Sequence, residues 1–155
     1  MAKPIPNGYG TITAHLCIRK AAEAIDFYRK AFGAEVVSRA DGPGGMVLHA
    51  ALKIGDTIFM LVDEMPQMKG WVSPQRLGGT TIALHLSVED VDSVFDRAVA
   101  AGCKVSLPVM NAFWGDRYGK VTDPYGHEWT MATHVEDVPA EEVARRAEAF
   151  FKNME

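Results

Sequence analysis

The sequence predicts an α+β fold, in which two βαβββ modules are followed by a C-terminal helix. Strand and helix patterns occur twice in the same order along the chain. The segment His15-Leu-Cys-Ile18 is echoed by His85-Leu-Ser-Val88 at an offset of 70 residues. Each of the two predicted helices is followed by a glycine, Gly33 or Gly102. Together these observations indicate a duplicated structural unit.

The first module is expected over residues 11–63. Its first strand, Thr11–Ile18, contains β-branched residues in alternation. The helix Ala21–Phe32 has apolar residues at helical spacing and ends before Gly33, which stands where a C-cap residue belongs. A turn at 41–45 and a tight connection at Gly55-Asp56 separate the remaining strands. These strands are expected at Glu35–Arg39, Met46–Ile54 and Thr57–Asp63.

A linker loop over residues 64–79 joins the modules, and its length calls for a functional or connecting role. The second module is expected over residues 80–134, with Asp90 as the N-cap of its helix. The tail, 139–154, is expected to be a helix with acidic residues in its first turn, which suits the helix dipole. The elements of the second module are expected at Thr80–Val88, Val91–Ala101, Lys104–Leu107, Arg117–Val121 and Glu128–Thr133.

Composition narrows the class of protein. With 155 residues, 48% hydrophobic and 23% charged, residues 1–155 are expected to form a single domain with a sizeable core. The net charge is −4 and no basic stripe is present, so we expect no nucleic-acid partner. No apolar stretch reaches the roughly 18 residues of a membrane span, so we expect no membrane partner. Two cysteines without a CxxC motif are expected to be buried thiols in a reducing, cytoplasmic location.

Several motifs resemble a known family. The segment 21–34 closely resembles the first helix of vicinal-oxygen-chelate proteins, the glyoxalase/bleomycin-resistance/dioxygenase superfamily. Residues 88–92 and 98–102 look like its second helix, and Asp123-Pro-Tyr-Gly126 is similar to its closing hairpin. The run Phe113–Gly119 looks like the PhnB-like branch. The resemblance covers residues 11 to 134. It implies that the strands of the two modules form a curled mixed-sheet cup that holds a small molecule, with the helices packed outside it.

Enzymes of this superfamily hold a divalent metal in the cup. The resemblance maps their ligand positions onto His15, Met60 (or Leu61), Ala83 and Thr130. Only His15 is a competent ligand, because alanine has no donor atom and a thioether is unsuited to a hard or borderline ion. We therefore expect no metal and no cofactor in this chain, which weakens the case for glyoxalase or extradiol-dioxygenase chemistry.

Strand alternation sorts the histidines by face. It places His15, Cys17, His49 and His85 toward the cup. Leu48, Ala50 and Leu52, which alternate with His49 and Ala51 in the third strand, are expected to pack outward against the helices. Three histidines sharing one concavity would form a displaced metal site or a polar ligand-binding cluster. Alternatively, each is separately hydrogen-bonded to backbone or water. Histidine side chains ordinarily titrate near neutrality, which suits a general base, so His85 is a candidate for that role although spacing gives it no carboxylate partner.

Aromatic residues near the cup are the second group of candidates. Trp114 and Tyr118 are expected to contact an apolar or planar ligand, whereas Asp116 and Arg117 could simply pair with each other. Trp71 on the linker loop, with the methionines beside it, forms either a lid or a subunit contact. His127 and His134 are expected to lie at the surface. The candidate methionines of the loop are Met65 and Met68.

Two functions remain open at this point. The first is a small-molecule-binding protein whose cup holds an apolar or aromatic compound without the usual metal. Its ligand-binding residues would be His15, His49, His85, Trp114 and Tyr118. The alternative is a metal-dependent isomerase, lyase or dioxygenase with a rearranged site around His15; no catalytic residue is assigned. A homodimer is expected from the habit of the family, in which paired modules usually assemble as dimers.

Overall fold

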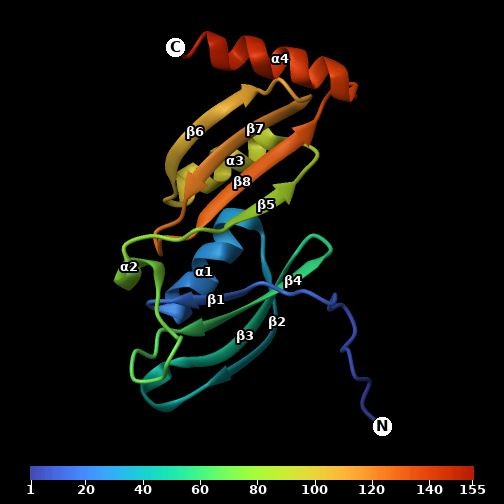
Figure 1. Ribbon diagram of the computed structural model, residues 1–155. Helices are drawn as coiled ribbons and strands as arrows, with labels where there is room; N and C mark the ends of the chain where they lie inside the picture. The colour runs from blue at the N-terminus through green and yellow to red at the C-terminus, as the bar shows by residue number, and fades with distance from the viewer.

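The computed structural model describes residues 1–155 and has the predicted α+β fold (Figure 1). The first module contains β1, α1, β2, β3 and β4, and the second contains β5, α3, β6, β7 and β8. The elements are β1 His15–Ile18, α1 Ala21–Phe32, β2 Glu35–Asp41, a 3₁₀ turn η1 Pro43–Gly45, β3 Val47–Ile54, β4 Thr57–Asp63, α2 Pro74–Leu77, β5 Ala83–Ser87, α3 Val91–Ala101, β6 Lys104–Asn111, β7 Asp116–Thr122, β8 Glu128–His134 and α4 Ala140–Lys152.

The two sheets repeat one topology. The strand orders are β1-β4-β3-β2 and β5-β8-β7-β6. In each sheet the first strand runs parallel to the last strand of its module, and the other pairs are antiparallel. The two parallel pairs also share their register, since His15 lies opposite Met60 and His85 lies opposite Thr130. The predicted duplication is therefore confirmed.

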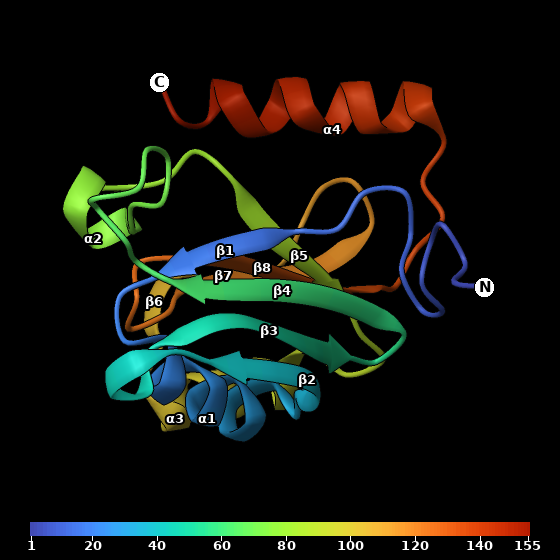
Figure 2. The same ribbon diagram turned by 90° about the horizontal axis from the view of Figure 1, so that it is seen from below.

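The helices lie on both sides of the sheets. In Figure 2, α1 and α3 lie next to each other on one side of the strands, and α4 lies on the opposite side. The faces of the sheets that turn away from α1 and α3 are called the concave face below. Because successive side chains of a strand point to opposite faces, each strand divides its residues between this face and the core.

Local sequence explains the helices of the modules. The apolar positions of α1 are buried, and Gly33 ends the helix with φ 68° and its N–H bonded to carbonyls of the last turn. Asp90 caps α3 as predicted, because its side chain accepts a hydrogen bond from the backbone N–H of Ser93. The predicted helix bounds 21–32 and 91–101 are confirmed.

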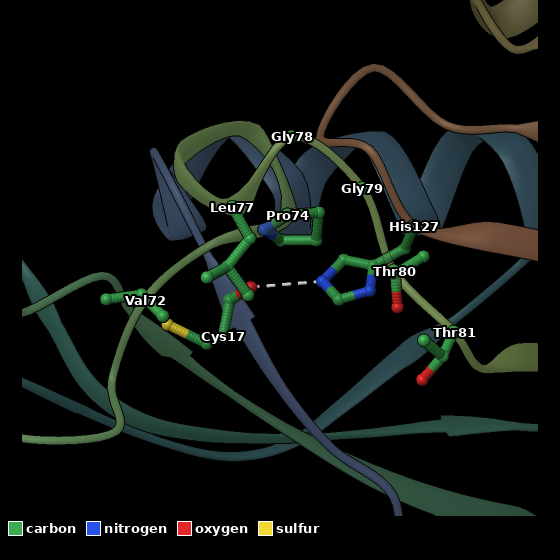
Figure 3. A pocket seen from close by; sticks show the side chains of 9 residues that line it. All are labelled: Cys17, Val72, Pro74, Leu77, Gly78, Gly79, Thr80, Thr81 and His127. Carbon is green, nitrogen blue, oxygen red and sulfur yellow. Dashed lines mark hydrogen bonds between the residues drawn. The ribbon is translucent and has the colours of Figure 1, made fainter.

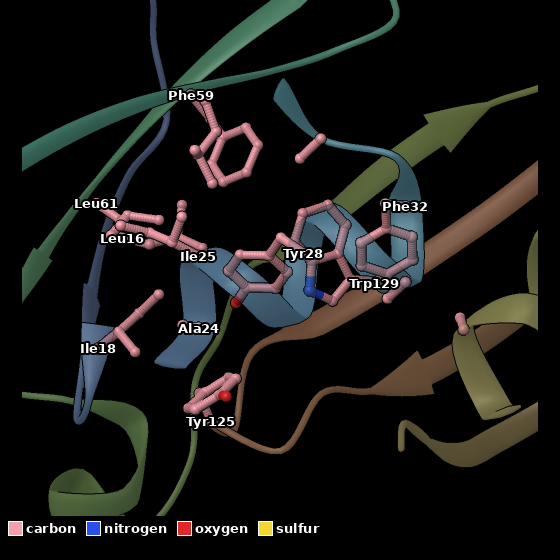
Figure 4. Packing of buried hydrophobic residues seen from close by; sticks show 14 of the residues in the cluster. Leu16, Ile18, Ala24, Ile25, Tyr28, Phe32, Phe59, Leu61, Tyr125 and Trp129 are labelled. Carbon is pink, nitrogen blue, oxygen red and sulfur yellow. The ribbon is translucent and has the colours of Figure 1, made fainter. Parts of the chain in front are cut away.

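An aromatic core joins the two modules (Figure 4). Tyr28 and Phe32 of α1 contact Trp129 of β8, at ring-centroid distances of 5.5 Å and 4.6 Å. The Tyr28 hydroxyl donates a hydrogen bond to Asp123 Oδ2, which also accepts one from Trp129 Nε1. Asp123 Oδ1 accepts two more from the backbone N–H groups of its own turn. A buried carboxylate is stable here because four donors surround it.

The structure corrects several predictions. Residues 11–14 do not belong to β1, and Ile12 is almost fully exposed. Leu48 does not pack outward: the β2–β3 ladder skips it in a bulge and leaves its side chain exposed. The linker contains a short helix, α2, with Ser73 as its N-cap. Finally, β6 continues to Asn111.

Candidate functional site

Strand alternation places the candidate histidines on the concave face. In β1, Leu16 and Ile18 are buried in the core, while His15 is exposed and Cys17 is half-buried. In β5 the alternate leucines pack against the core, and His85 is exposed between them. His49 of β3 is half-buried, next to the buried Ala50 of the core. The predicted facing of all three histidines agrees with this arrangement.

The first module brings together His15, His49 and Trp71. The ring of His15 lies 6.0 Å from that of His49 and 4.8 Å from that of Trp71, measured between centroids. Burial lowers the pKa of His15, and the neighbouring His49 lowers it further. Both effects favour the neutral imidazole of His15, so this histidine presents a planar, uncharged ring to the concave face.

Glu64 holds the linker loop that carries Trp71. Its buried carboxylate accepts hydrogen bonds from Arg19 Nε at 2.9 Å, Arg76 Nε at 2.7 Å and Ser73 Oγ at 2.8 Å. The bond from Arg19 contributes most to lowering the pKa of Glu64, to about 2. Met65 is buried and donates its N–H to the carbonyl of Trp71. The loop is therefore tied to β1, and Trp71 packs on His15 within the same chain.

The second module brings together His85, Tyr118 and Trp114, which we call the aromatic row. The rings of His85 and Tyr118 are stacked, with centroids 6.2 Å apart, and Trp114 lies 5.4 Å from Tyr118. A hydrogen bond of 2.7 Å joins His85 Nδ1 to Thr130 Oγ1. Trp114 Nε1 donates to Asp116 Oδ2 at 2.9 Å. Two of the three rings are thus held in place by side-chain hydrogen bonds.

Asp116 does not pair with Arg117, so that prediction is wrong. Arg117 instead binds Asp92 of α3, and Asp116 Oδ1 lies 2.8 Å from His134 Nδ1. His134 is exposed as expected, and its Nε2 lies 2.7 Å from Asp137 Oδ1. Asp137 and then Asp116 raise the pKa of His134, because a protonated ring donates to both carboxylates. The aromatic row therefore ends in a charged network that anchors Trp114.

Besides a mainly apolar pocket of about 560 Å³ that His85 lines together with Ile12 and Phe59, two more pockets open beside these groups. One, of about 570 Å³, borders the aromatic row and is lined by His85, Asp116 and His134 with five neighbours. The other, of about 540 Å³, lies between the end of β1 and the linker (Figure 3). There the ring nitrogen Nε2 of His127 lies 3.0 Å from the Cys17 carbonyl, to which it donates. His127 is thus half-buried rather than solvated, because it links the two modules.

Cys17 in the second of these pockets is not an activated nucleophile. Burial raises the pKa of its thiol to about 11, with Glu64 and Asp63 adding to the effect. The thiolate is the reactive form, and at neutral pH the group is therefore almost entirely protonated.

The candidate residues form two separate groups of rings. One contains His15 and His49, and the other contains His85, Tyr118 and Trp114. No set of three or more His, Cys, Asp or Glu side chains is arranged to hold a metal ion. His15 lies opposite Met60 and packs on Trp71, while Thr130 is bonded to His85. This donor set does not fit a hard or borderline divalent ion.

Sequence reasoning missed Thr130 as the partner of His85 and Glu64 as the anchor of the loop. The sequence could have indicated the pairing of Thr130 with His85, because the offset of 70 residues that relates His15 to His85 also relates Met60 to Thr130. By this register His85, and not Ala83, is the internal counterpart of His15. The bonds of Glu64 to Arg19 and Arg76 had no signal, because they depend on the path of the loop.

Comparison with known proteins agrees with this fold. Residues 10–131 match the family model described as the Glyoxalase/Bleomycin resistance protein/Dioxygenase superfamily. The protein Mb0911c of Mycobacterium bovis is 46% identical over 134 residues, which cover 85% of this chain and 88% of that protein.

No helix of the chain is both long and apolar enough to cross a membrane.

Solved structures show the same similarity. The crystal structure of TioX from a Micromonospora species is 29% identical, with a TM-score of 0.64 over 81% of this chain and 100% of that one. A PhnB protein from Bacillus cereus shares the fold at 24% identity, with a TM-score of 0.63 over 80% of this chain and 99% of that one. The helix α4 lies beyond the residues that match the family model.

Proposed function

The chain belongs to the glyoxalase/bleomycin resistance protein/dioxygenase superfamily, and from this premise we propose that its concave face binds a small apolar or aromatic compound. In this proposal Trp114 and Tyr118 grip the compound, and His15, His49 or His85 supplies the polar contact. Binding requires no metal or other cofactor. The proposal places the ligand against the second module, on the rings of Trp114 and Tyr118 and beside the pocket of about 570 Å³ that His85 lines.

The observation that carries the proposal is the aromatic row. Trp114 is 37% exposed although its indole N–H is already bonded to Asp116, so its ring is both fixed and available. The hydrogen bond to Thr130 likewise fixes the ring of His85. Rings that are ordered before binding lose little conformational entropy when a ligand arrives. Planar ligands gain most from such a surface, because aromatic rings favour offset-stacked and edge-to-face contacts.

The alternative function is a metal-dependent isomerase, lyase or dioxygenase with a rearranged site around His15. A metal there would have His49 and the Met60 thioether nearby, whereas catalytic zinc usually has three nitrogen, oxygen or thiolate ligands from the protein. The residues present therefore favour binding without metal. Elemental analysis of protein purified without an affinity tag is the test, and about one zinc, iron, nickel or manganese ion per chain would contradict the proposal.

The ligand proposal is tested by a screen of aromatic compounds followed by titration of the hit. The Trp114→Ala variant loses about 0.5–1.5 kcal/mol of aromatic contact and roughly 25 cal/mol per Å² of buried apolar area. We therefore expect its affinity to fall by several kcal/mol at most, and that of His85→Ala to fall less. Val105→Ala, on the exposed edge strand β6, serves as the control with unchanged affinity.

Two outcomes of this experiment decide between the functions. If Trp114→Ala and His85→Ala both bind the hit like the parent protein, the pocket is assigned to the wrong residues. Recovery of the unchanged compound by chromatography supports binding, whereas a converted compound supports the enzyme.

We further infer a cytoplasmic homodimer. Phe151 and other apolar side chains near the C-terminus are exposed in the single chain. A dimer interface would remove this apolar surface from water. Both cysteines are free thiols, as expected in a reducing compartment. Light scattering should give twice the 16.9 kDa chain mass, and the mass of one chain at micromolar concentration would contradict the dimer.

A further inference from the structure

Two histidines of the first module have imidazole nitrogens that bond to nothing else in the chain. Three of the five histidines are hydrogen-bonded within the chain, namely His85, His127 and His134. His15 and His49 take part in no such bond, and their rings are neighbours, with centroids 6.0 Å apart. His15 is exposed and His49 is half-buried, so the nitrogens of both rings are free to bind an ion at the concave face.

The register of the first sheet places a thioether between these two histidines. Strand β4 lies between β1 and β3 (Figure 2). Met60 of β4 is opposite His15 on one side and opposite Ala51 on the other, and the residues before and after Met60 are buried in the core. His49 stands two residues before Ala51 and therefore shares its face. Alternation thus puts His15, Met60 and His49 together on the concave face.

The spacing of the two imidazoles fits a shared ion. A metal–nitrogen bond of about 2.0–2.1 Å, added to the radius of the ring, places the centre of each imidazole about 3.2 Å from the ion. Two imidazoles on one ion therefore have centroids about 6.4 Å apart or less. The 6.0 Å between His15 and His49 is within this limit, so rotation about side-chain bonds is enough to aim both rings at one ion.

The types of donor indicate the kind of ion. Imidazole suits copper as well as zinc, whereas a thioether selects soft ions such as Cu⁺. Among the histidines only His134 pairs with a carboxylate, so the donors at His15 and His49 are not accompanied by a negative charge. Neutral donors leave an ion with its full charge in a partly desolvated place, which costs less for a monovalent ion than for a divalent one. Trp71 packs on His15 at 4.8 Å, and an indole face attracts a cation.

We propose that His15, His49 and Met60 form a binding site for one soft monovalent ion of the Cu⁺ class, with Trp71 beside it. The same residues that do not fit a hard or borderline divalent ion fit this class. The inference goes beyond the function proposed above and uses neither Trp114 nor Tyr118.

The test uses Ag⁺ alone as the probe, because it is soft and monovalent like Cu⁺ and is stable in air. Thiols also bind Ag⁺, so every protein carries Cys17→Ser and no affinity tag; the other thiol, Cys103, is buried. Calorimetry in a chloride-free buffer should show one Ag⁺ per chain. Zn²⁺, which prefers nitrogen, oxygen or thiolate ligands, should bind more weakly. In methyl-labelled protein the NMR signal of the Met60 methyl group should shift on addition of Ag⁺.

Three variants each remove one donor: His15→Gln, His49→Gln and Met60→Leu. Each should bind Ag⁺ at least about tenfold more weakly, since the loss of even an outer contact of a metal site typically costs about 10–100-fold in affinity. Met68→Leu removes an exposed thioether of the linker and is the matched control, with unchanged affinity. Exchange of Met for Leu is usually tolerated in a packed site, and circular dichroism checks the fold of every variant.

The outcomes separate this site from the aromatic one. If the three site variants bind Ag⁺ as tightly as the Cys17→Ser protein, or if Met68→Leu weakens binding as much as Met60→Leu, the site is wrong. An unshifted Met60 methyl signal refutes it even where a site variant fails to fold. Tighter binding of Zn²⁺ than of Ag⁺ refutes the preference for a soft ion. Met60→Leu should bind an aromatic compound like the parent protein, so either proposal can fail without the other.

Discussion

The hydroxyl of Tyr28 is expected to be a major stabilising contact between the modules. It belongs to α1 of the first module and donates to Asp123 Oδ2 of the second, at 2.5 Å in a fully buried setting. Burial raises the pKa of Tyr28 well above its ordinary value, and Asp123 raises it further, so the hydroxyl remains a donor at every ordinary pH. Tyr28→Phe removes this donor and keeps the ring in the core.

The size of the effect follows from the charge of the acceptor. A hydrogen bond to a charged group contributes about 1.5–3 kcal/mol, and Asp123 stays buried with only three donors in the variant. For a domain of this length, 1 kcal/mol shifts the melting temperature by about 2–4 °C. Tyr28→Phe should therefore melt about 3–12 °C lower than the parent protein, with a matching loss of unfolding free energy in urea.

Tyr125→Phe is the matched control. It removes the same atom from the same aromatic cluster, but its hydroxyl donates at 3.2 Å to Glu23, which is exposed to solvent. Exposed interactions of this kind contribute about 0–1 kcal/mol. Equal unfolding free energies for the two variants, or a Tyr28→Phe protein as stable as the parent, would refute the reasoning.

Three further predictions concern the supports of the site. The low pKa of Glu64 stabilises the fold fully at pH values above the ordinary value of about 4.5, and this contribution is lost as the pH falls through about 2. The free energy of unfolding of Glu64→Gln, measured in urea, should therefore depend less on pH between 2 and 5 than that of the parent protein. The same pH dependence in both proteins would count against the role of Glu64. The raised pKa of His134 stabilises its hydrogen-bond network fully below about pH 6.5, and the effect is lost as the pH rises through the pKa that His134 has in the folded protein. An NMR titration should show a lower pKa of His134 in Asp137→Asn. An unaltered titration would rule out the contact with Asp137 as the cause of the raised pKa. Gly115 has φ +106°, and in Gly115→Ala the new Cβ would lie 2.2 Å from the Glu136 carbonyl oxygen. In Gly44→Ala the new Cβ meets nothing within 4 Å, so that variant should lose only about 1–2 kcal/mol of unfolding free energy, and Gly115→Ala should lose more. Equal losses in the two variants would show that the close contact at Gly115 relaxes freely.

Much of the fold and part of the site could be predicted from local pattern. The bounds of α1 and α3, the glycines that end them and the Asp90 cap depend on neighbours within a few residues. The facing of His15 and His85 follows from the two-residue period of a strand. The duplicated topology follows from the repeated order of elements. Errors arose where pattern was not decisive, as at the bulge that exposes Leu48.

Sequence alone therefore determined most of the elements and most of their faces, and its motifs indicated the family. The tertiary structure decided which of these residues meet: His15 with Trp71, His85 with Thr130, and Trp114 with the chain of rings that leads to α4. Whether two residues distant in sequence meet depends on strand register and loop path. Both are set by many small packing and hydrogen-bond energies summed over the whole chain, and no local window of sequence contains that sum.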